Sequence, residues 1–131
     1  HPAYTDVVRE VDEFFAGRLA RLEQLGVRRE QVALDPGIGF GKTLEHNLQL
    51  LGALPRFVRH GRPVLLGVSR KSFLGKLTGG ENPAERLPGA LACAALAVRD
   101  GVQILRVHDV RETVAAVRVA EAVERKKVIS S

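Results

Sequence analysis

Hydrophobic residues recur along the chain with two different spacings, and the two spacings alternate. From Val7 to Leu25 they lie three or four positions apart, which predicts one long amphipathic helix. Three short apolar runs then each predict a buried strand, and a segment with helical spacing follows each run. The predicted strands are 32–34, 64–68 and 104–107, and the predicted helical segments are 44–60, 84–99 and 110–126.

Proline and acidic residues place the breaks and starts of these helices. Asp6 or Thr5 can cap the first helix. Pro55 is expected to break the segment 44–60 into two helices, and Pro88 suits the first turn of the segment 84–99. Asp109, with an acidic residue three positions later, predicts a capping box at the start of the last helix.

The order of elements defines the fold class. A helix followed by three strand–helix units predicts an α/β protein with a parallel sheet and right-handed crossovers. The basic segment 69–80 is expected to be a loop with one helical turn at Phe73 and Leu74.

Composition narrows the function classes. The chain has 131 residues, enough for one domain but short of the roughly 250 of an eight-fold α/β barrel. A net charge of +5 favours an anionic ligand, but the charges are spread along the chain, so nucleic acid is not expected. The single Cys excludes an internal disulfide, and no apolar run approaches the length of a membrane span. With no visible signal peptide, we expect a cytoplasmic protein.

The chain begins His1-Pro2 and contains no Met. We therefore expect it to be either processed or a piece of a longer protein.

Polar residues cluster where each predicted strand ends. Asp35 follows the first strand, Ser69–Ser72 the second, and Arg106 and His108 lie at the end of the third. The carboxyl ends of parallel strands share one edge, where ligands bind in barrels and open sheets. The three clusters are therefore expected to form one site.

The glycine-rich segment 35–43 resembles two phosphate-binding motifs without matching either. Pro36 stands where a P-loop needs its first glycine, and Lys42 stands where a dinucleotide fingerprint needs its last. A carboxylate at a strand end remains, followed by glycines that let a ligand approach the backbone. Asp35 and the glycines could equally be a helix cap and a tight turn.

The other two clusters are cationic. Arg70 and Lys71 are adjacent, which suits a nearby anion or aromatic ring but also an ordinary solvated loop. Strand alternation puts Arg106 and His108 on one face, a donor pair that suits a diphosphate, although a strand-end His can be purely structural. No His, Cys, Asp and Glu set has metal-ligand spacing. His46 and His60 are expected at the surface, away from this edge.

Together the clusters resemble the C-terminal half of dihydropteroate synthases. The resemblance rests on three segments in the same order: LDPGIGFGK at 34–42, GVSRKSFLG at 67–75 and RVHDV at 106–110. It implies a (β/α)8 TIM barrel, of which residues 1–131 form a partial pterin-binding domain with strands six to eight and helices five to eight. It also implies a transferase that condenses 6-hydroxymethyl-7,8-dihydropterin diphosphate with 4-aminobenzoate, the sulfonamide-sensitive step of folate biosynthesis.

The resemblance assigns roles to individual residues. Those implied to bind the pterin are Asp35, Gly67, Lys71 and Arg106. Those implied to bind the diphosphate are Arg106 and His108, and those around the aminobenzoate are Phe40, Arg70 and Ser72. The catalytic residues implied are Lys71, Arg106 and His108.

The resemblance also implies partners outside this chain. Mg²⁺ would assist the diphosphate, but its protein ligand belongs to the first half of the barrel. A homodimer through the late helices is expected, and the isolated chain is not expected to turn over substrate. Two alternatives stay open: the pterin-binding domain of a folate-dependent methyltransferase, which the Ser69–Ser72 loop disfavours, and a non-catalytic paralogue.

Overall fold

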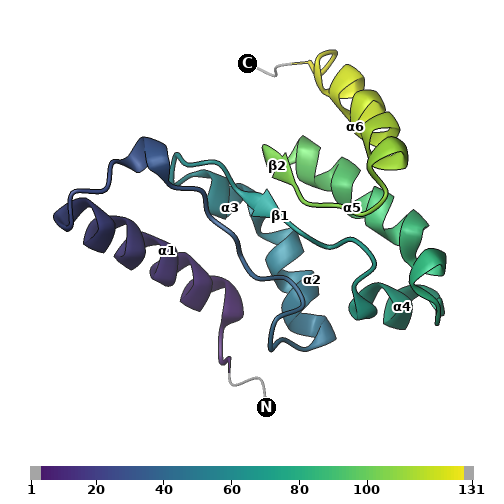
Figure 1. Cartoon of the computed structure of the whole chain (residues 1–131), viewed down its shortest axis with the longest axis horizontal. Coiled ribbons are helices and arrows are strands. Elements are labelled where there is room, and N and C mark those ends of the chain that lie inside the picture. Colours follow the sequence, from purple (N-terminus) through teal and green to yellow (C-terminus); the bar gives the residue numbers. More distant parts are fainter. Residues whose placement is uncertain (1–3, 129–131) are drawn as a thin grey trace.

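A computed structural model of the chain describes residues 4–128 and shows the predicted first helix followed by alternating extended segments and helices (Figure 1). Two of the three predicted strands are present as strands, and the first, 32–34, is reduced to a single bridge at Leu34. The longer helices are α1 (Val7–Gln24), α2 (Leu44–Gly52), α3 (Leu54–Val58), α4 (Ser72–Thr78), α5 (Leu87–Arg99) and α6 (Val110–Glu124). Two short 3-10 helices, η1 (Arg29–Gln31) and η2 (Pro83–Arg86), connect them. Within residues 4–128, no helix is both long enough and apolar enough to cross a membrane.

The sheet is parallel, as predicted. Strand β1 (Leu65–Leu66) pairs with β2 (Ile104–Leu105) in parallel, and Leu34 forms a parallel bridge to Val64 on the other side of β1. The three chain segments therefore run side by side in the expected direction. They are much shorter than predicted, because an apolar run indicates burial rather than ladder pairing: Val68 is buried but lies beyond the ladder.

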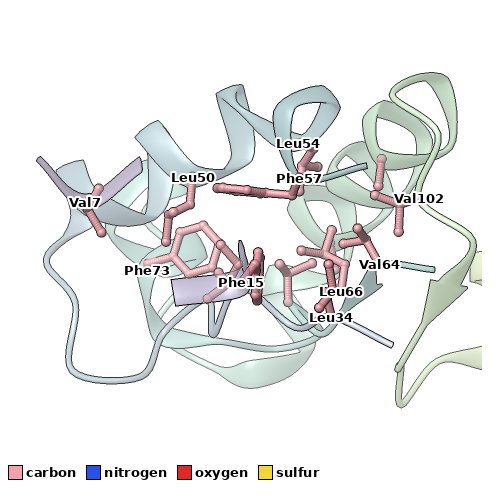
Figure 2. Close-up of a cluster of buried hydrophobic side chains, with 14 of the residues drawn as sticks. Val7, Phe15, Leu34, Leu50, Leu54, Phe57, Val64, Leu66, Phe73 and Val102 are labelled. Atoms are coloured by element: carbon pink, nitrogen blue, oxygen red, sulfur yellow. The ribbon is translucent and has the colours of Figure 1, made fainter. Parts of the chain in front are cut away.

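The main core gathers buried side chains from the sheet and from helices α1 to α5. Figure 2 shows Phe15, Phe57, Leu50 and Leu66 pointing into it from different elements. The rings of Phe15 and Phe57 meet edge to face with centroids 5.5 Å apart, and Phe57 is fully buried. Helices α1 and α6 lie at opposite sides of the molecule, and α6 packs along α5 (Figure 1).

Most of the predicted helix boundaries are confirmed. The Asp6 carboxylate caps α1 by accepting a hydrogen bond from the Arg9 amide, 3.1 Å long. Pro55 and Pro88 stand in the first turns of α3 and α5, so the break in 44–60 falls where the sequence predicted it. The prediction for 69–80 was wrong in length, because α4 runs for seven residues with Phe73 and Leu74 buried beneath it.

The expectation that His60 lies at the surface was wrong. Its ring is largely buried, stacks edge to face on Phe15, and Nε2 lies 2.7 Å from the Asp12 carboxylate on α1. Arg56 on α3 donates to the other oxygen of that carboxylate at 3.0 Å. Partial burial raises the pKa of Asp12, but the hydrogen bonds from His60 and Arg56 outweigh burial and leave that pKa below its ordinary value.

Because the lowered pKa of Asp12 favours its charged form in the folded state, Asp12 stabilises the fold above about pH 4 and loses this effect as the pH falls through the lowered pKa. We expect Asp12→Asn to cost about 1 kcal/mol in urea unfolding at pH 7. The difference from the parent chain should shrink in acid. Glu13→Gln on the same helix, whose side chain is 64% exposed, is the matched control. A difference independent of pH would contradict this assignment.

Candidate functional site

A cavity of about 290 Å³ opens at the carboxyl ends of β1 and β2, at the edge where the sequence placed the site. It is lined by Gly67, Ser69, Lys71, Arg106, Val107 and His108. Five of these six, all except Val107, belong to the clusters or candidate residues that the sequence analysis named. The parallel ladder brings them together, since both loops leave the sheet at the same edge.

The guanidinium group of Arg106 lies directly on Gly67. The Arg106 amide donates to the Leu66 carbonyl at 3.0 Å, which extends the β1–β2 ladder by one bond. A Cβ atom at position 67 would stand 2.9 Å from Nη2 and 3.1 Å from Nε of Arg106. The absence of a side chain at Gly67 therefore leaves the space that the Arg106 guanidinium occupies in the cavity wall.

Lys71 reaches across the cavity to the glycine-rich loop. Its Nζ donates to the Ile38 carbonyl and lies 4.2 Å from the centroid of the Phe40 ring. Burial lowers the pKa of the Lys71 ammonium below its ordinary value, the charge of Arg106 lowers it further, and the Asp35 carboxylate opposes both. An anion entering the cavity would relieve the repulsion between these two cations.

The glycine-rich loop is held in a fixed shape. Gly37, Gly39 and Gly41 all have positive φ angles, of 72°, 86° and 61°, which explains why glycines alternate here. The Asp35 carboxylate accepts from the Gly37 amide at 2.8 Å, and the buried Asn47 side chain accepts from the Gly39 amide at 2.8 Å. The hydrogen bond between the Asp35 side chain and the Gly37 amide forms an Asx turn. The tight turn that the sequence left open as an alternative is therefore present.

The Lys42 side chain folds back on the same loop and holds it by hydrogen bonds. Its Nζ donates to the carbonyls of Gly37 at 2.9 Å and Phe40 at 3.0 Å. Burial lowers the pKa of Lys42, while the Asp35 carboxylate opposes the effect. The Asp35 charge thus acts on both Lys42 and Lys71, and its carboxylate remains exposed beside the cavity.

Ser69 is buried in the cavity wall and contacts His108 twice. Its Oγ accepts from the His108 amide at 3.1 Å and lies 3.1 Å from the ring atom Nδ1. The hydroxyl therefore joins the loop after β1 to the loop after β2. Sequence reasoning gave Ser69 no role of its own.

Arg70 points away from the cavity and pairs with Asp109. Its guanidinium donates Nε to Oδ2 at 3.1 Å and Nη2 to Oδ1 at 2.7 Å. Arg70 has a φ of +57°, and its carbonyl accepts from Nη1 of Arg86 at 2.9 Å. The hydrogen bonds from Arg70 outweigh desolvation and lower the pKa of Asp109.

This pairing overturns the capping box predicted at Asp109. Asp109 is the N-cap residue of α6, but its side chain makes no capping hydrogen bond. The carboxylate is already engaged by a guanidinium from the neighbouring loop, which offers two hydrogen bonds between oppositely charged groups in place of one from a backbone amide.

The residues predicted to surround an aminobenzoate are spread around the rim. Phe40 is 59% exposed and stands over the Lys71 ammonium. Ser72 is exposed at the first position of α4. None of these three lines the cavity, and neither does the pterin candidate Asp35. The structure therefore brings together Gly67, Lys71, Arg106 and His108, but not the full predicted set.

Asn47 is a site residue that sequence reasoning missed. It is buried on the inner face of α2, three positions from Leu44 and three from Leu50. An amide side chain within an apolar helical stripe was the available signal, because a buried amide must find a hydrogen-bond partner.

Parallel strand segments joined by helices, with a cationic cavity at their carboxyl edge, define the chain as an α/β protein whose candidate site lies where α/β proteins commonly bind ligands. The sequence profile of the pterin binding enzymes matches residues 1–108. The chain belongs to the pterin-binding enzyme family.

Individual relatives are similar throughout the chain. Dihydropteroate synthase of Escherichia coli K12 is 51% identical over 121 residues, which are 92% of this chain and 43% of that protein. The crystal structure of Xanthomonas albilineans dihydropteroate synthase in complex with 7,8-dihydropteroate superposes with a TM-score of 0.91 at 45% identity. The superposed part includes 98% of this chain and 48% of the Xanthomonas protein. A Yersinia pestis dihydropteroate synthase in a sulfonamide drug complex gives the same TM-score at 42% identity, covering 97% and 46%.

These findings confirm the resemblance and the fold class: the chain has the fold of part of a dihydropteroate synthase barrel. The chain spans a little under half the length of these relatives. The numbering of its units as strands six to eight stays a prediction.

The contact between Gly67 and Arg106 can be tested by one methyl group. We expect Gly67→Ala to displace the guanidinium and weaken pyrophosphate binding about tenfold, the value of one lost charge-assisted hydrogen bond. Isothermal titration calorimetry measures the affinity. Gly52→Ala, where a Cβ meets nothing within 4 Å, is the matched control and should bind like the parent chain. Equal affinities for the two variants would contradict the role given to Gly67.

Proposed function

We propose that this chain is part of a dihydropteroate synthase, which joins 6-hydroxymethyl-7,8-dihydropterin diphosphate to 4-aminobenzoate and releases diphosphate. The observation that carries the proposal is the cavity where Gly67, Lys71, Arg106 and His108 meet at the carboxyl edge, in a chain 51% identical to a dihydropteroate synthase. The Ser69–Ser72 loop favours a synthase over a methyltransferase domain, which has no aminobenzoate to bind.

The pterin is assigned to Asp35 and Lys71. A carboxylate only accepts hydrogen bonds, so Asp35 suits the 2-amino group and ring N–H of a pterin. The Lys71 ammonium is a mobile donor and suits the pterin carbonyl and ring nitrogen. The Asp35 carboxylate raises the pKa of Lys71 against the effects of burial and Arg106, so the two groups are close enough for their charges to interact.

The diphosphate is assigned to Arg106 and His108. The guanidinium plane offers a fork of donors on one edge and a flat face for the pterin on the other. His108 lines the same cavity. Because the cavity concentrates positive charge, it favours the state in which negative charge develops on the leaving group.

The aminobenzoate is assigned to the rim formed by Phe40, Arg70 and Ser72. Phe40 offers an exposed ring for stacking, and the Ser72 hydroxyl is free to face solvent. The ion pair between Arg70 and Asp109 holds this rim against the loop that carries His108.

The reaction is a displacement at the pterin methylene carbon. The carbon–oxygen bond to the diphosphate breaks, its electron pair leaves with the diphosphate, and the amine nitrogen of 4-aminobenzoate forms the new bond and loses a proton. Lys71, Arg106 and His108 contribute by positioning the substrates and stabilising the departing charge.

Mg²⁺, which the family resemblance implies, finds no site of its own here. Among residues 4–128, no three His, Cys, Asp or Glu side chains lie close enough together to hold a metal ion. We propose that Mg²⁺ assists the departing diphosphate in the assembled barrel, where the first half supplies its protein ligand.

The proposal extends to assembly and place in the cell. The chain is proposed to complete a barrel with a first half that supplies further ligands, to form a homodimer through its late helices and to act in cytoplasmic folate synthesis. Exposed Val119 and Val123 on α6 leave apolar side chains at the surface of this last helix, which is compatible with such an association.

An assay with labelled 4-aminobenzoate and the pterin diphosphate tests the function. The assembled protein that contains this chain should form dihydropteroate, and the 131-residue chain alone should not. An assembled protein that makes no dihydropteroate would refute the synthase assignment. Turnover at a normal rate by the chain alone would refute the incomplete site.

Asp35 provides a more local test of pterin recognition. We expect Asp35→Asn to weaken binding of a dihydropterin about 10- to 100-fold, because hydrogen bonds to a charged acceptor are lost or become neutral. Calorimetry with the dihydropterin measures the ratio. Glu121→Gln on α6, an exposed charge change far from the cavity, should leave the affinity unchanged. A ratio near one for Asp35→Asn would remove this residue from the pterin site.

A further inference from the structure

Ser69 is the buried polar side chain of the cavity for which the proposed reaction has no use. Its exposed fraction is 8%, and its hydroxyl lies 3.1 Å from two nitrogens of the same residue, the amide and Nδ1 of His108. A solvent-facing serine would not need such an arrangement. The hydroxyl therefore fixes something about His108.

The chemistry of the three groups determines what is fixed. The His108 amide can only donate, so it takes one lone pair of the Ser69 oxygen. The hydroxyl proton still needs an acceptor, and among residues 4–128 the Nδ1 atom is the acceptor within hydrogen-bond distance. A neutral ring that accepts at Nδ1 must carry its proton on Nε2.

We propose that Ser69 is a positioning residue that holds neutral His108 in the Nε2–H tautomer, so that His108 presents a donor to an oxygen of the diphosphate. This inference rests on the proposed function for its ligand, but its structural part concerns the free chain.

The neighbouring charges explain why a neutral donor is useful here. Lys71 and Arg106 line the same cavity as His108, and a third positive charge would repel both. Asp109, the next residue, is occupied by Arg70. With its proton on Nε2, the ring can donate to an anionic oxygen without adding a charge of its own.

Nitrogen NMR of the whole 131-residue chain tests the tautomer directly. Two-bond proton–nitrogen spectra of the ¹⁵N-His-labelled chain at a pH where the ring is neutral distinguish Nε2–H from Nδ1–H, and His108→Gln identifies the signals. We expect the Nε2–H pattern in the parent chain and in Ser69→Thr, which keeps the hydroxyl. Ser69→Ala should give a mixture of both tautomers.

Pyrophosphate is the probe for the functional part. We expect Ser69→Ala to bind it about tenfold more weakly than the parent chain, the value of one charge-assisted hydrogen bond, and Ser69→Thr to restore most of the affinity. Thr78→Val is the matched control: it removes a hydroxyl that donates to the Leu74 carbonyl at 2.9 Å, away from the cavity. This variant should change neither readout.

Two results would overturn the proposal: an Nδ1–H tautomer in the parent chain, or an unchanged tautomer in folded Ser69→Ala. If Ser69→Ala does not fold, an Nδ1–H tautomer in the parent chain or in Ser69→Thr would still overturn the proposal. A failure of the synthase assignment looks different, because the Nε2–H tautomer would persist in a protein that makes no dihydropteroate.

Discussion

The register of the parallel ladder is the constraint on which the site depends. Leu65 pairs with Ile104 and Leu66 with Leu105, a separation of 39 residues. The same separation continues beyond the last strand bond, where Ser69 meets His108 and Arg70 meets Asp109. Gly67 and Arg106 keep it too. Four backbone residues thus determine which side chains face each other across the cavity, and a slip by one residue would put apolar Val107 where the guanidinium lies.

Much of this arrangement could be predicted from the sequence, because burial leaves a periodic trace. The spacing of apolar residues located α1, α2, α5 and α6, and the prolines located the break before α3. Strand lengths could not be predicted, since buried Val68 looks like a strand residue whether or not it has a ladder partner. Helix α4 was underestimated because Gly75 and Lys76 dilute its apolar face.

The site was predictable in composition but not in its internal pairing. Parallel topology alone placed Asp35, Lys71, Arg106 and His108 at one edge. The capping box at Asp109 was expected because only local partners are visible in a sequence, whereas the competing guanidinium of Arg70 comes from 39 positions away. The role of Ser69 could not be predicted for the same reason, because its partner His108 is also 39 positions away. The buried amide of Asn47 was visible in the sequence only as a polar residue on an apolar helix face.

Most of the contacts that shape the glycine-rich loop join residues close in sequence. The contacts between the loops after β1 and β2 join residues 39 positions apart. Asp35, Lys42 and Asn47 restrain the loop from within a span of 13 residues, and Lys71 adds one contact to the Ile38 carbonyl from 33 positions away. The contacts between the other two loops require a much longer segment of chain to close first, which costs more conformational entropy. We therefore expect the glycine-rich loop to form early in folding, before the loops after β1 and β2 come together. If this segment were moved to another strand end of a parallel α/β scaffold, its three local restraints would move with it, and the host would have to supply the contact that Lys71 makes here.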